Sequence, residues 1–269
     1  MAAKYNMQYQ LSDNAAELYE RYSGRIMVPW IDSLIELSDL QPGERVLDLA
    51  CGTGKVARLA AVGVGSSGSV VGLDLNAAML ATARDVPPSD SGAAIEWREG
   101  DATHLPFEDA TFDIVLCSQG LQYFPDRTAA LREIRRVLVT GGRLVLSVWG
   151  PLQDNPFQSA VYGALGSHLG IEGVGGFVLG DAQEVHSLIA DEGFRDVSVR
   201  SIERTLSLPA AQEMVTGFLR AHPTAETIAA LPEADRTALF DDIIQALSPY
   251  VSGEELVVPG KVNFAMGRG

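Results

Sequence analysis

The nine residues 46–54, with the sequence VLDLACGTG, narrow the fold more than any other stretch of the chain. An apolar run typical of a buried strand carries the acid Asp48 near its end, and Gly52 and Gly54 follow before a helical stretch that begins near Lys55. Because glycine has no Cβ, a ligand can approach the main chain closely at these two positions. The segment therefore predicts a strand, a ligand-binding loop and a helix, in that order.

The same pattern of strand and helix continues as far as Trp149. Alternation of this kind predicts parallel strands joined by right-handed crossovers, with ligands bound beyond the carboxyl ends of the strands. The segments that carry it are the strands 70–74 and 97–101, each ending in an acid, the strand 112–117, the helix 131–138, the glycine turn 141–142 and the strand 144–149.

Two cofactors compete for the glycine loop. Residues 52–57 fit the G-x-G-x-x-A dinucleotide fingerprint, and Asp74 stands at the spacing of its acidic partner, which leaves an NAD(P)-dependent oxidoreductase as an alternative. The carboxylate of Asp48 would, however, lie close to a helix N-terminus that must face a pyrophosphate. An acid at this position suits a ligand with an ammonium and a sulfonium group better.

From about Leu40 to Trp149 the series of motifs resembles the class I S-adenosylmethionine-dependent methyltransferases, in particular the small-molecule branch that includes ubiquinone/menaquinone methyltransferases. The resemblance implies an α/β fold with a Rossmann-like, seven-stranded, mostly parallel sheet in the order 3-2-1-4-5-7-6. The last strand would be antiparallel, helices would cover both faces, and a helical cap would be added. It also implies S-adenosylmethionine as cofactor, S-adenosylhomocysteine as product, and in-line methyl transfer to O, N or C of a small hydrophobic or aromatic metabolite.

The resemblance also assigns site residues. Asp48 would contact the methionine part of the cofactor, Asp74 the ribose hydroxyls and Asp101 the adenine amino group. Asp48 could instead cap the following loop, and Asp101 could be a turn acid. The other expected cofactor contacts are Ala50, Cys51, Gly52, Gly54, Leu75, Met79, Gly100, Ala102 and Ser118, of which Met79 could equally belong to the core. The residues expected to face the acceptor are Tyr22, Trp30, Gln119 and Gln122.

No catalytic base stands out in the sequence. His222, beside Pro223, is the only histidine considered as a weak candidate, and a lone histidine is more often structural. No cluster of metal ligands is visible, so no metal is predicted. A methyltransferase-like binding subunit without catalytic activity is the third hypothesis.

The predicted organisation has three parts: an N-terminal helical lid over 1–40, a cofactor-binding core over 41–150, and the rest of the sheet over 151–269. The last part would carry cap insertions at about 151–180 and 209–250. We expect Pro29 to break or restart the N-terminal helical pattern and Asp181 to cap a helix. We expect a last strand over 256–265, interrupted at Pro259–Gly260.

Composition limits the partners. The formal net charge is −15, which repels phosphate backbones, so nucleic acid is a poor candidate. No apolar run approaches the ~18–20 residues of a membrane span, and the polar first ten residues do not resemble a signal peptide. With only two cysteines, no disulfide framework is indicated and a cytoplasmic location is expected. The expected partner is a small-molecule acceptor, and a homodimer is left open.

Overall fold

The structure is a computed structural model that describes residues 19–87, 92–171 and 175–269. The chain divides into two compact units, so each is described by itself. Unit 1 comprises residues 1–28, 152–175 and 203–261, and unit 2 comprises 29–151, 176–202 and 262–269.

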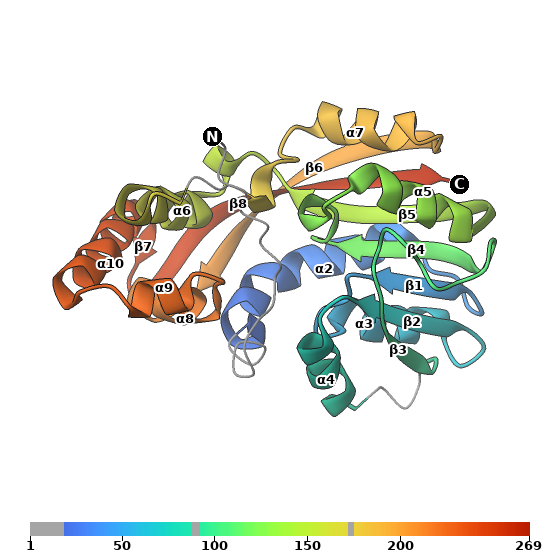
Figure 1. Cartoon of the computed structure of the whole chain (residues 1–269), viewed down its shortest axis with the longest axis horizontal. Helices are drawn as coiled ribbons and strands as arrows, with labels where there is room; N and C mark the ends of the chain where they lie inside the picture. The colour runs from blue at the N-terminus through green and yellow to red at the C-terminus, as the bar shows by residue number, and fades with distance from the viewer. Residues whose placement is uncertain (1–18, 88–91, 172–174) are drawn as a thin grey trace. The chain divides into compact units, whose positions relative to one another are not determined.

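The strands form one mixed sheet in the order β3-β2-β1-β4-β5-β8-β6, and a short β7 pairs with β8 (Figure 1). The first five strands are parallel, and β8 is antiparallel to β5. The predicted fold class is confirmed, with one strand more than expected because a two-residue strand precedes the predicted seventh. The strands are β1 (Arg45–Leu49), β2 (Ser69–Asp74), β3 (Ile95–Glu99), β4 (Phe112–Ser118), β5 (Leu138–Trp149), β6 (Arg195–Leu208), β7 (Val251–Ser252) and β8 (Glu255–Arg268).

Alternation along the central strands decides which side chains face which helices in unit 2. Leu47 and Leu49 of β1 belong to the core cluster formed with α5 (Arg127–Val137) and α7 (Ala182–Asp191). Asp48, between them, therefore faces the opposite side, where α3 (Lys55–Val64) lies. A further helix, α4 (Ala77–Asp85), follows β2. One-residue alternation thus directs the only acid of β1 toward the start of a helix.

Unit 1 is mainly helical. Its helices are η1 (Tyr19–Ser23), the start of α2 (Gly24–Ser38), η3 (Leu152–Asp154), α6 (Pro156–Leu169), α8 (Ala211–Ala221), α9 (Ala225–Ala229), α10 (Glu233–Leu247) and η5 (Ser248–Tyr250). Phe157 of α6 packs edge-to-face on Phe218 of α8, with ring centroids 5.2 Å apart. Among the described helices of the whole chain, none is long and apolar enough to cross a membrane.

The structure corrects the prediction at two prolines. Helix α2 continues across Pro29, because the fixed φ of proline is helical and only one backbone hydrogen bond is lost; the border between the two units falls at this residue. Strand β8 likewise continues through Pro259. The pairing of β8 with β5 begins only at Val262, so β5 requires no N–H group at position 259.

The glycine turn at 141–142 also differs from expectation. The structure assigns both glycines to β5, which begins at Leu138 directly after α5. The register with β4 shifts between Phe112 and Ile114, and Gly141 has a φ of 78°. The two glycines therefore form an irregularity within the strand, where only glycine adopts the required backbone without strain.

Candidate functional site

Asp48 of β1 is buried, with 1% of its surface exposed. Its Oδ2 accepts a hydrogen bond of 2.8 Å from the N–H of Ala57 in the first turn of α3, as the capping alternative expects. Its Oδ1 has no hydrogen-bond partner among the residues that the structure describes. Burial raises the pKa of Asp48 to about 8, assisted by the charge of Asp74 and opposed by the Ala57 hydrogen bond and by Arg58. One oxygen thus supports the helix while the other is available to a cationic ligand.

The loop after β1 has a left-handed backbone at three positions, with φ values of 57° at Ala50, 54° at Gly52 and 82° at Gly54. The two glycines serve different purposes. A side chain at Gly54 would overlap the ring of Trp97, whereas a Cβ at Gly52 would meet no described atom within 4 Å. Gly54 therefore permits packing inside the protein, and Gly52 leaves open space above the loop.

Trp97 was not predicted as a site residue. It lies on β3 opposite Gly72 of β2, and its ring would clash with a side chain at Gly72 as well as at Gly54. Its ring therefore packs directly against the glycine loop. A glycine within a strand is the one sequence signal that hints at such a close neighbour.

Asp74 ends β2 and also organises the loop. Its Oδ2 accepts from the N–H of Gly52 at 2.7 Å, and its Oδ1 accepts from the N–H of Asn76 at 2.8 Å. Burial raises the pKa of this carboxyl, and the backbone hydrogen bonds oppose that rise. The next residue, Leu75, is 65% exposed, while Met79 is buried in α4, as the core alternative expects. An acid and an exposed apolar side chain therefore stand together at the end of β2.

At the end of β3, the N–H of Gly100 donates to the carbonyl of Asp74 at 3.0 Å. Asp101 is exposed, and its Oδ1 accepts from the N–H of Thr103 at 2.8 Å, as in a turn that begins with aspartate. Ala102 is buried. The geometry fits the turn alternative and leaves Oδ2 of Asp101 for a further donor.

The end of β4 carries a chain of polar side chains. Gln119 has a φ of 56°, uncommon for a residue with a side chain, and its N–H donates to the carbonyl of Ser147 at 2.9 Å. The Nε2 of Gln122 donates to Oε1 of Gln119 at 2.7 Å. The Oγ of Ser118 lies 3.5 Å from that of Ser147. The predicted residues Ser118, Gln119 and Gln122 are thus brought together, with Ser147 added by the structure.

Tyr22 and Trp30, two of the residues expected to face the acceptor, lie in different units. In unit 1, the ring of Tyr22 packs where a side chain at Gly217 of α8 would lie. In unit 2, Trp30 is fully buried, and its Nε1 has no acceptor within the described part of the chain. Trp30 thus shares unit 2 with the strand-end residues, whereas Tyr22 belongs to unit 1.

His222 lies in unit 1, 6% exposed, with its ring 5.8 Å from Tyr162 and 5.9 Å from Phe218. Its Nδ1 is 2.8 Å from Oγ1 of Thr224 and accepts from the backbone N–H of Thr224 at 3.3 Å. Burial lowers the pKa of His222 to about 4. It is therefore neutral at pH 7 and a weak base.

The cysteines are free and buried. Burial raises the pKa of Cys117 to about 12, and burial together with Asp48 and Asp74 raises the pKa of Cys51 well above its usual range. Both remain thiols, so neither has the lowered pKa that marks a nucleophilic cysteine. Within residues 19–87, 92–171 and 175–269, no group of three or more His, Cys, Asp or Glu side chains is placed to hold a metal ion.

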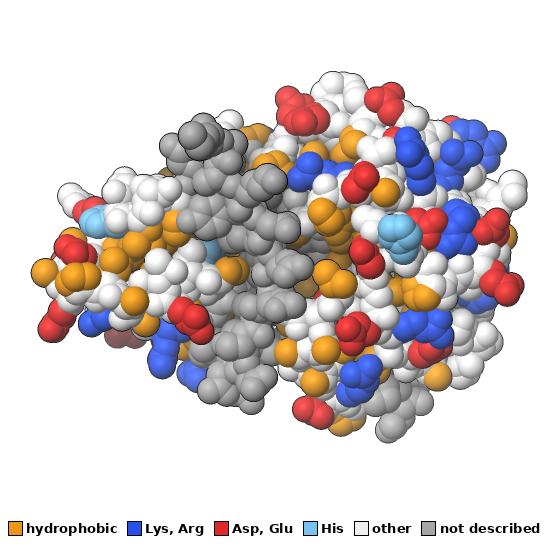
Figure 2. Space-filling view, viewed as in Figure 1, with side chains coloured by type: hydrophobic (Ala, Val, Ile, Leu, Met, Phe, Trp, Pro, Cys, Tyr) orange, Lys and Arg blue, Asp and Glu red, His pale blue; other side chains and the backbone are white. Residues whose placement is uncertain are grey.

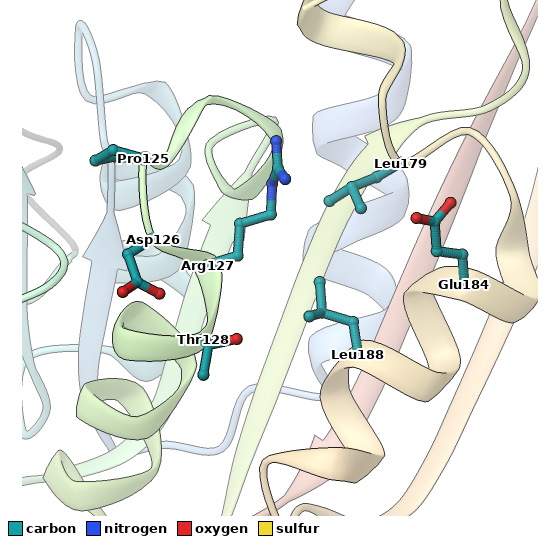
Figure 3. A pocket seen from close by; sticks show the side chains of 7 residues that line it. All are labelled: Pro125, Asp126, Arg127, Thr128, Leu179, Glu184 and Leu188. Atoms are coloured by element: carbon teal, nitrogen blue, oxygen red, sulfur yellow. The ribbon is translucent and has the colours of Figure 1, made fainter.

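A separate cavity of about 300 Å³ lies between the start of α5 and α7, and Figure 3 shows the side chains that line it. It is lined by Pro125, Asp126, Arg127, Thr128, Leu179, Glu184 and Leu188, none of which was predicted as a site residue. Because the cavity contains none of the predicted residues, the candidate site is defined by the strand ends rather than by this cavity.

On the face shown in Figure 2, acidic and basic side chains are intermingled over the described surface.

The parallel sheet has acids at the ends of β1 and β2, and an open glycine loop follows β1. This arrangement is typical of Rossmann-like proteins that bind a cofactor with an adenosine group, the class to which class I methyltransferases belong. Residues 47–146 match the methyltransferase domain family. The predicted resemblance to the class I S-adenosylmethionine-dependent methyltransferases is confirmed, and the comparisons give the oxidoreductase and binding-subunit alternatives no support.

Two curated relatives are quinone methyltransferases. The 2-phytyl-1,4-naphtoquinone methyltransferase of Synechococcus elongatus is 38% identical over 141 residues, which cover 51% of this chain and 60% of the relative. The ubiquinone/menaquinone biosynthesis C-methyltransferase UbiE of Ectopseudomonas mendocina is 38% identical over 165 residues, which cover 60% and 59%. The matched region thus spans only about 60% of the length of these relatives.

Among solved structures, phosphoethanolamine N-methyltransferase 2 of Haemonchus contortus, in complex with phosphomonomethylethanolamine and S-adenosylhomocysteine, has a TM-score of 0.59. It is 18% identical, and the match covers 96% of this chain and 57% of that one. At this identity the likeness supports the fold of the chain.

Proposed function

We propose that this chain binds S-adenosylmethionine at the carboxyl ends of β1, β2 and β3 and transfers its methyl group to a small hydrophobic or aromatic acceptor. The observation that carries the proposal is Asp48, whose buried Oδ1 lacks a partner among the described residues beside the open loop at Gly52. At its raised pKa this carboxyl is protonated near pH 7 without a ligand, and an ammonium group beside Oδ1 would supply a donor and favour the ionised form.

The residues present fit the cofactor. Asp48 would hold the ammonium end, directly or through water, and Asp74, whose carboxyl accepts from the backbone N–H groups of Gly52 and Asn76, would accept from the ribose hydroxyls. Leu75 offers an exposed apolar surface for the adenine ring, and Oδ2 of Asp101 could accept from its amino group. The remaining predicted contacts, Ala50, Cys51, Gly52, Gly54, Met79, Gly100, Ala102 and Ser118, shape the loop ends around these groups.

When bound, S-adenosylmethionine supplies an electrophilic methyl group on a sulfonium. The task of the chain is to orient the acceptor in line with that methyl and to exclude water, which can lower the barrier by roughly 7–11 kcal/mol at best. His222, with its pKa of about 4, is not suited to act as a strong base. This favours an acceptor that needs little base, such as the carbon of an electron-rich ring or an acidic phenol. The quinone methyltransferase activity named for the relatives supports the same class.

The test is isothermal titration of S-adenosylhomocysteine into the wild-type chain and into Asp74→Ala and Asp48→Asn. We expect micromolar or tighter binding to the wild type and loss of most of it in both variants. Asp113→Asn is the control, because Asp113 pairs with Arg45 on the surface at the start of the strands. Thermal-shift measurements with NADH belong to the same experiment. Stabilisation by NADH rather than by S-adenosylhomocysteine would reject the proposal.

Three further assignments are part of the proposal. A cytoplasmic location is supported by the two free, buried cysteines, which fit a reducing compartment. Exclusion of nucleic acid follows from the net charge of −15, and a homodimer is left open.

The lid over 1–40 and the cap insertions at 151–180 and 209–250 stay predictions, and residues 1–18 and 172–174 lie outside the described residues. Domain exchange with a relative of different acceptor preference tests them.

A further inference from the structure

The side-chain amide of Gln122 is buried, and only its nitrogen has a hydrogen-bond partner among the described residues. It is 2% exposed, and its Nε2 donates to Oε1 of Gln119. Its backbone carbonyl accepts from Arg127 at 2.9 Å. Its Oε1 has no donor within the part of the chain that the structure describes. A buried amide oxygen whose side chain is oriented by the hydrogen bond from its own nitrogen is a preorganised acceptor for a hydrogen bond from a ligand.

This oxygen belongs to a segment that adjoins the cofactor loop. A Cβ at Gly120, in the same turn, would lie 2.8 Å from the Cβ of Ala50 and 2.8 Å from Sγ of Cys117. Gly120 therefore allows the turn that carries Gln119 and Gln122 to pack directly against the left-handed residue of the loop after β1. A group bound by Gln122 is consequently close to a ligand of that loop.

Aromatic side chains follow the same strand ends in unit 2. Trp149, the last residue of β5, stacks with Phe177 at a centroid distance of 5.6 Å and an interplanar angle of 22°. The hydroxyl of Tyr123, the neighbour of Gln122, lies 2.6 Å from where a Cβ at Gly176 would be. A flat ring placed near the ends of β4 and β5 would find apolar surface in the same unit as the unmet Oε1 of Gln122.

We propose that Oε1 of Gln122 accepts a hydrogen bond from a ring hydroxyl of the methyl acceptor, and that Gln119 is the positioning residue that orients the amide. The inference rests on the proposed function and adds a specificity-determining residue, which would select an acceptor ring with a free hydroxyl over the corresponding ether. A methyl ether has the same ring but cannot donate, so it leaves the amide oxygen unpaired.

The experiment compares binding of 1,4-dihydroxynaphthalene and 1,4-dimethoxynaphthalene to the S-adenosylhomocysteine-loaded chain, without oxygen, by quenching of tryptophan fluorescence. We expect the wild type to prefer the dihydroxy compound by about tenfold or more, the range expected when a buried acceptor is left unpaired. Gln122→Met, which keeps the shape and removes the acceptor, should reduce this preference to within about twofold. Gln183→Met, at an exposed position on α7, should retain it.

The outcomes separate the two proposals. Failure of the wild type to bind S-adenosylhomocysteine would reject the proposed function itself. If the wild type binds S-adenosylhomocysteine but shows no preference for the hydroxylated ring, or if Gln122→Met keeps the full preference, the assignment of Gln122 is overturned while the cofactor site stands. Absence of the preference in the wild type overturns the assignment even if the variant does not fold.

Discussion

Replacing Asp48 with asparagine should stabilise the protein relative to the wild type at pH 7, and this difference in unfolding free energy should grow as the pH rises from 5 to 7. The carboxyl of Asp48 has a pKa of about 8 in the folded chain because it is buried, and about 3.9 in an unfolded chain. Because the folded pKa is the higher one, the contribution of this group to stability is fully present below about pH 4. It is lost as the pH rises toward about 8.

The size of the effect follows from the two pKa values. Between them the wild type loses about 1.4 kcal/mol of unfolding free energy per pH unit through this one group, or about 3 kcal/mol between pH 5 and pH 7. Asparagine does not titrate and can still accept from the N–H of Ala57. Its Nδ2, in place of the unpartnered oxygen, costs about 1–3 kcal/mol at every pH. The unfolding free energy of the variant minus that of the wild type should therefore rise by about 3 kcal/mol between pH 5 and pH 7.

The assay is urea unfolding at pH 5, 6 and 7, followed by tryptophan fluorescence. The three tryptophans, Trp30, Trp97 and Trp149, all lie in unit 2, so the signal reports the unit that contains Asp48. Asp113→Asn is the matched control. The hydrogen bond from Arg45 holds the pKa of Asp113 below its usual range, so this group titrates outside the window and its effect should not vary between pH 5 and 7.

A difference between Asp48→Asn and the wild type that stays constant from pH 5 to pH 7 would refute the reasoning. It would mean that the carboxyl is already ionised in the folded chain, compensated by a charge or by water. The same variant should bind S-adenosylhomocysteine more weakly under the proposed function. If the variant gains stability and loses affinity for S-adenosylhomocysteine, the buried carboxyl of Asp48 lowers the stability of the chain but is needed for cofactor binding.

Two other predictions concern the glycine loop and the buried histidine. Gly54→Ala should cost about 3 kcal/mol or more, because its methyl overlaps Trp97 at a left-handed φ, whereas Gly52→Ala should cost only the backbone strain of about 1–2 kcal/mol; equal losses in thermal denaturation would contradict this difference. His222 should show the NMR signals of a neutral imidazole from pH 8 to pH 5, since burial lowers its pKa to about 4. The stability that it contributes above about pH 6.5 should fall by about 3 kcal/mol as the pH drops to 4, and a ring that titrates near pH 6.5 would show the environment to be wrongly assigned.

The sequence predicted what depends on local order. The strand with Asp48, the loop glycines, the helix from Lys55 and the cap at Asp181 were all expected where they occur, since periodicity and capping are short-range signals. Asp181 accepts from the N–H groups of Gln183 and Glu184, as a capping residue should.

Features that depend on neighbours in space were missed. The role of Trp97 follows from its register opposite Gly72, which no local pattern encodes. Pro259 was misjudged because its tolerance depends on where the pairing between β8 and β5 begins. The unmet oxygen of Gln122 was missed for the same reason, because the neighbouring residues in the sequence do not predict that this polar side chain is buried. Burial and register, rather than residue type, decide these cases.

The position of β8 has a consequence for how the chain folds during synthesis. This strand, Glu255–Arg268, inserts between β5 and β6, which are complete many residues earlier. Until it leaves the ribosome, β5 presents an open hydrogen-bonding edge and β6 has no neighbour with which to pair, so a half-made chain exposes two aggregation-prone borders. Nascent chains stalled between residues 208 and 255 are therefore the species most in need of a chaperone.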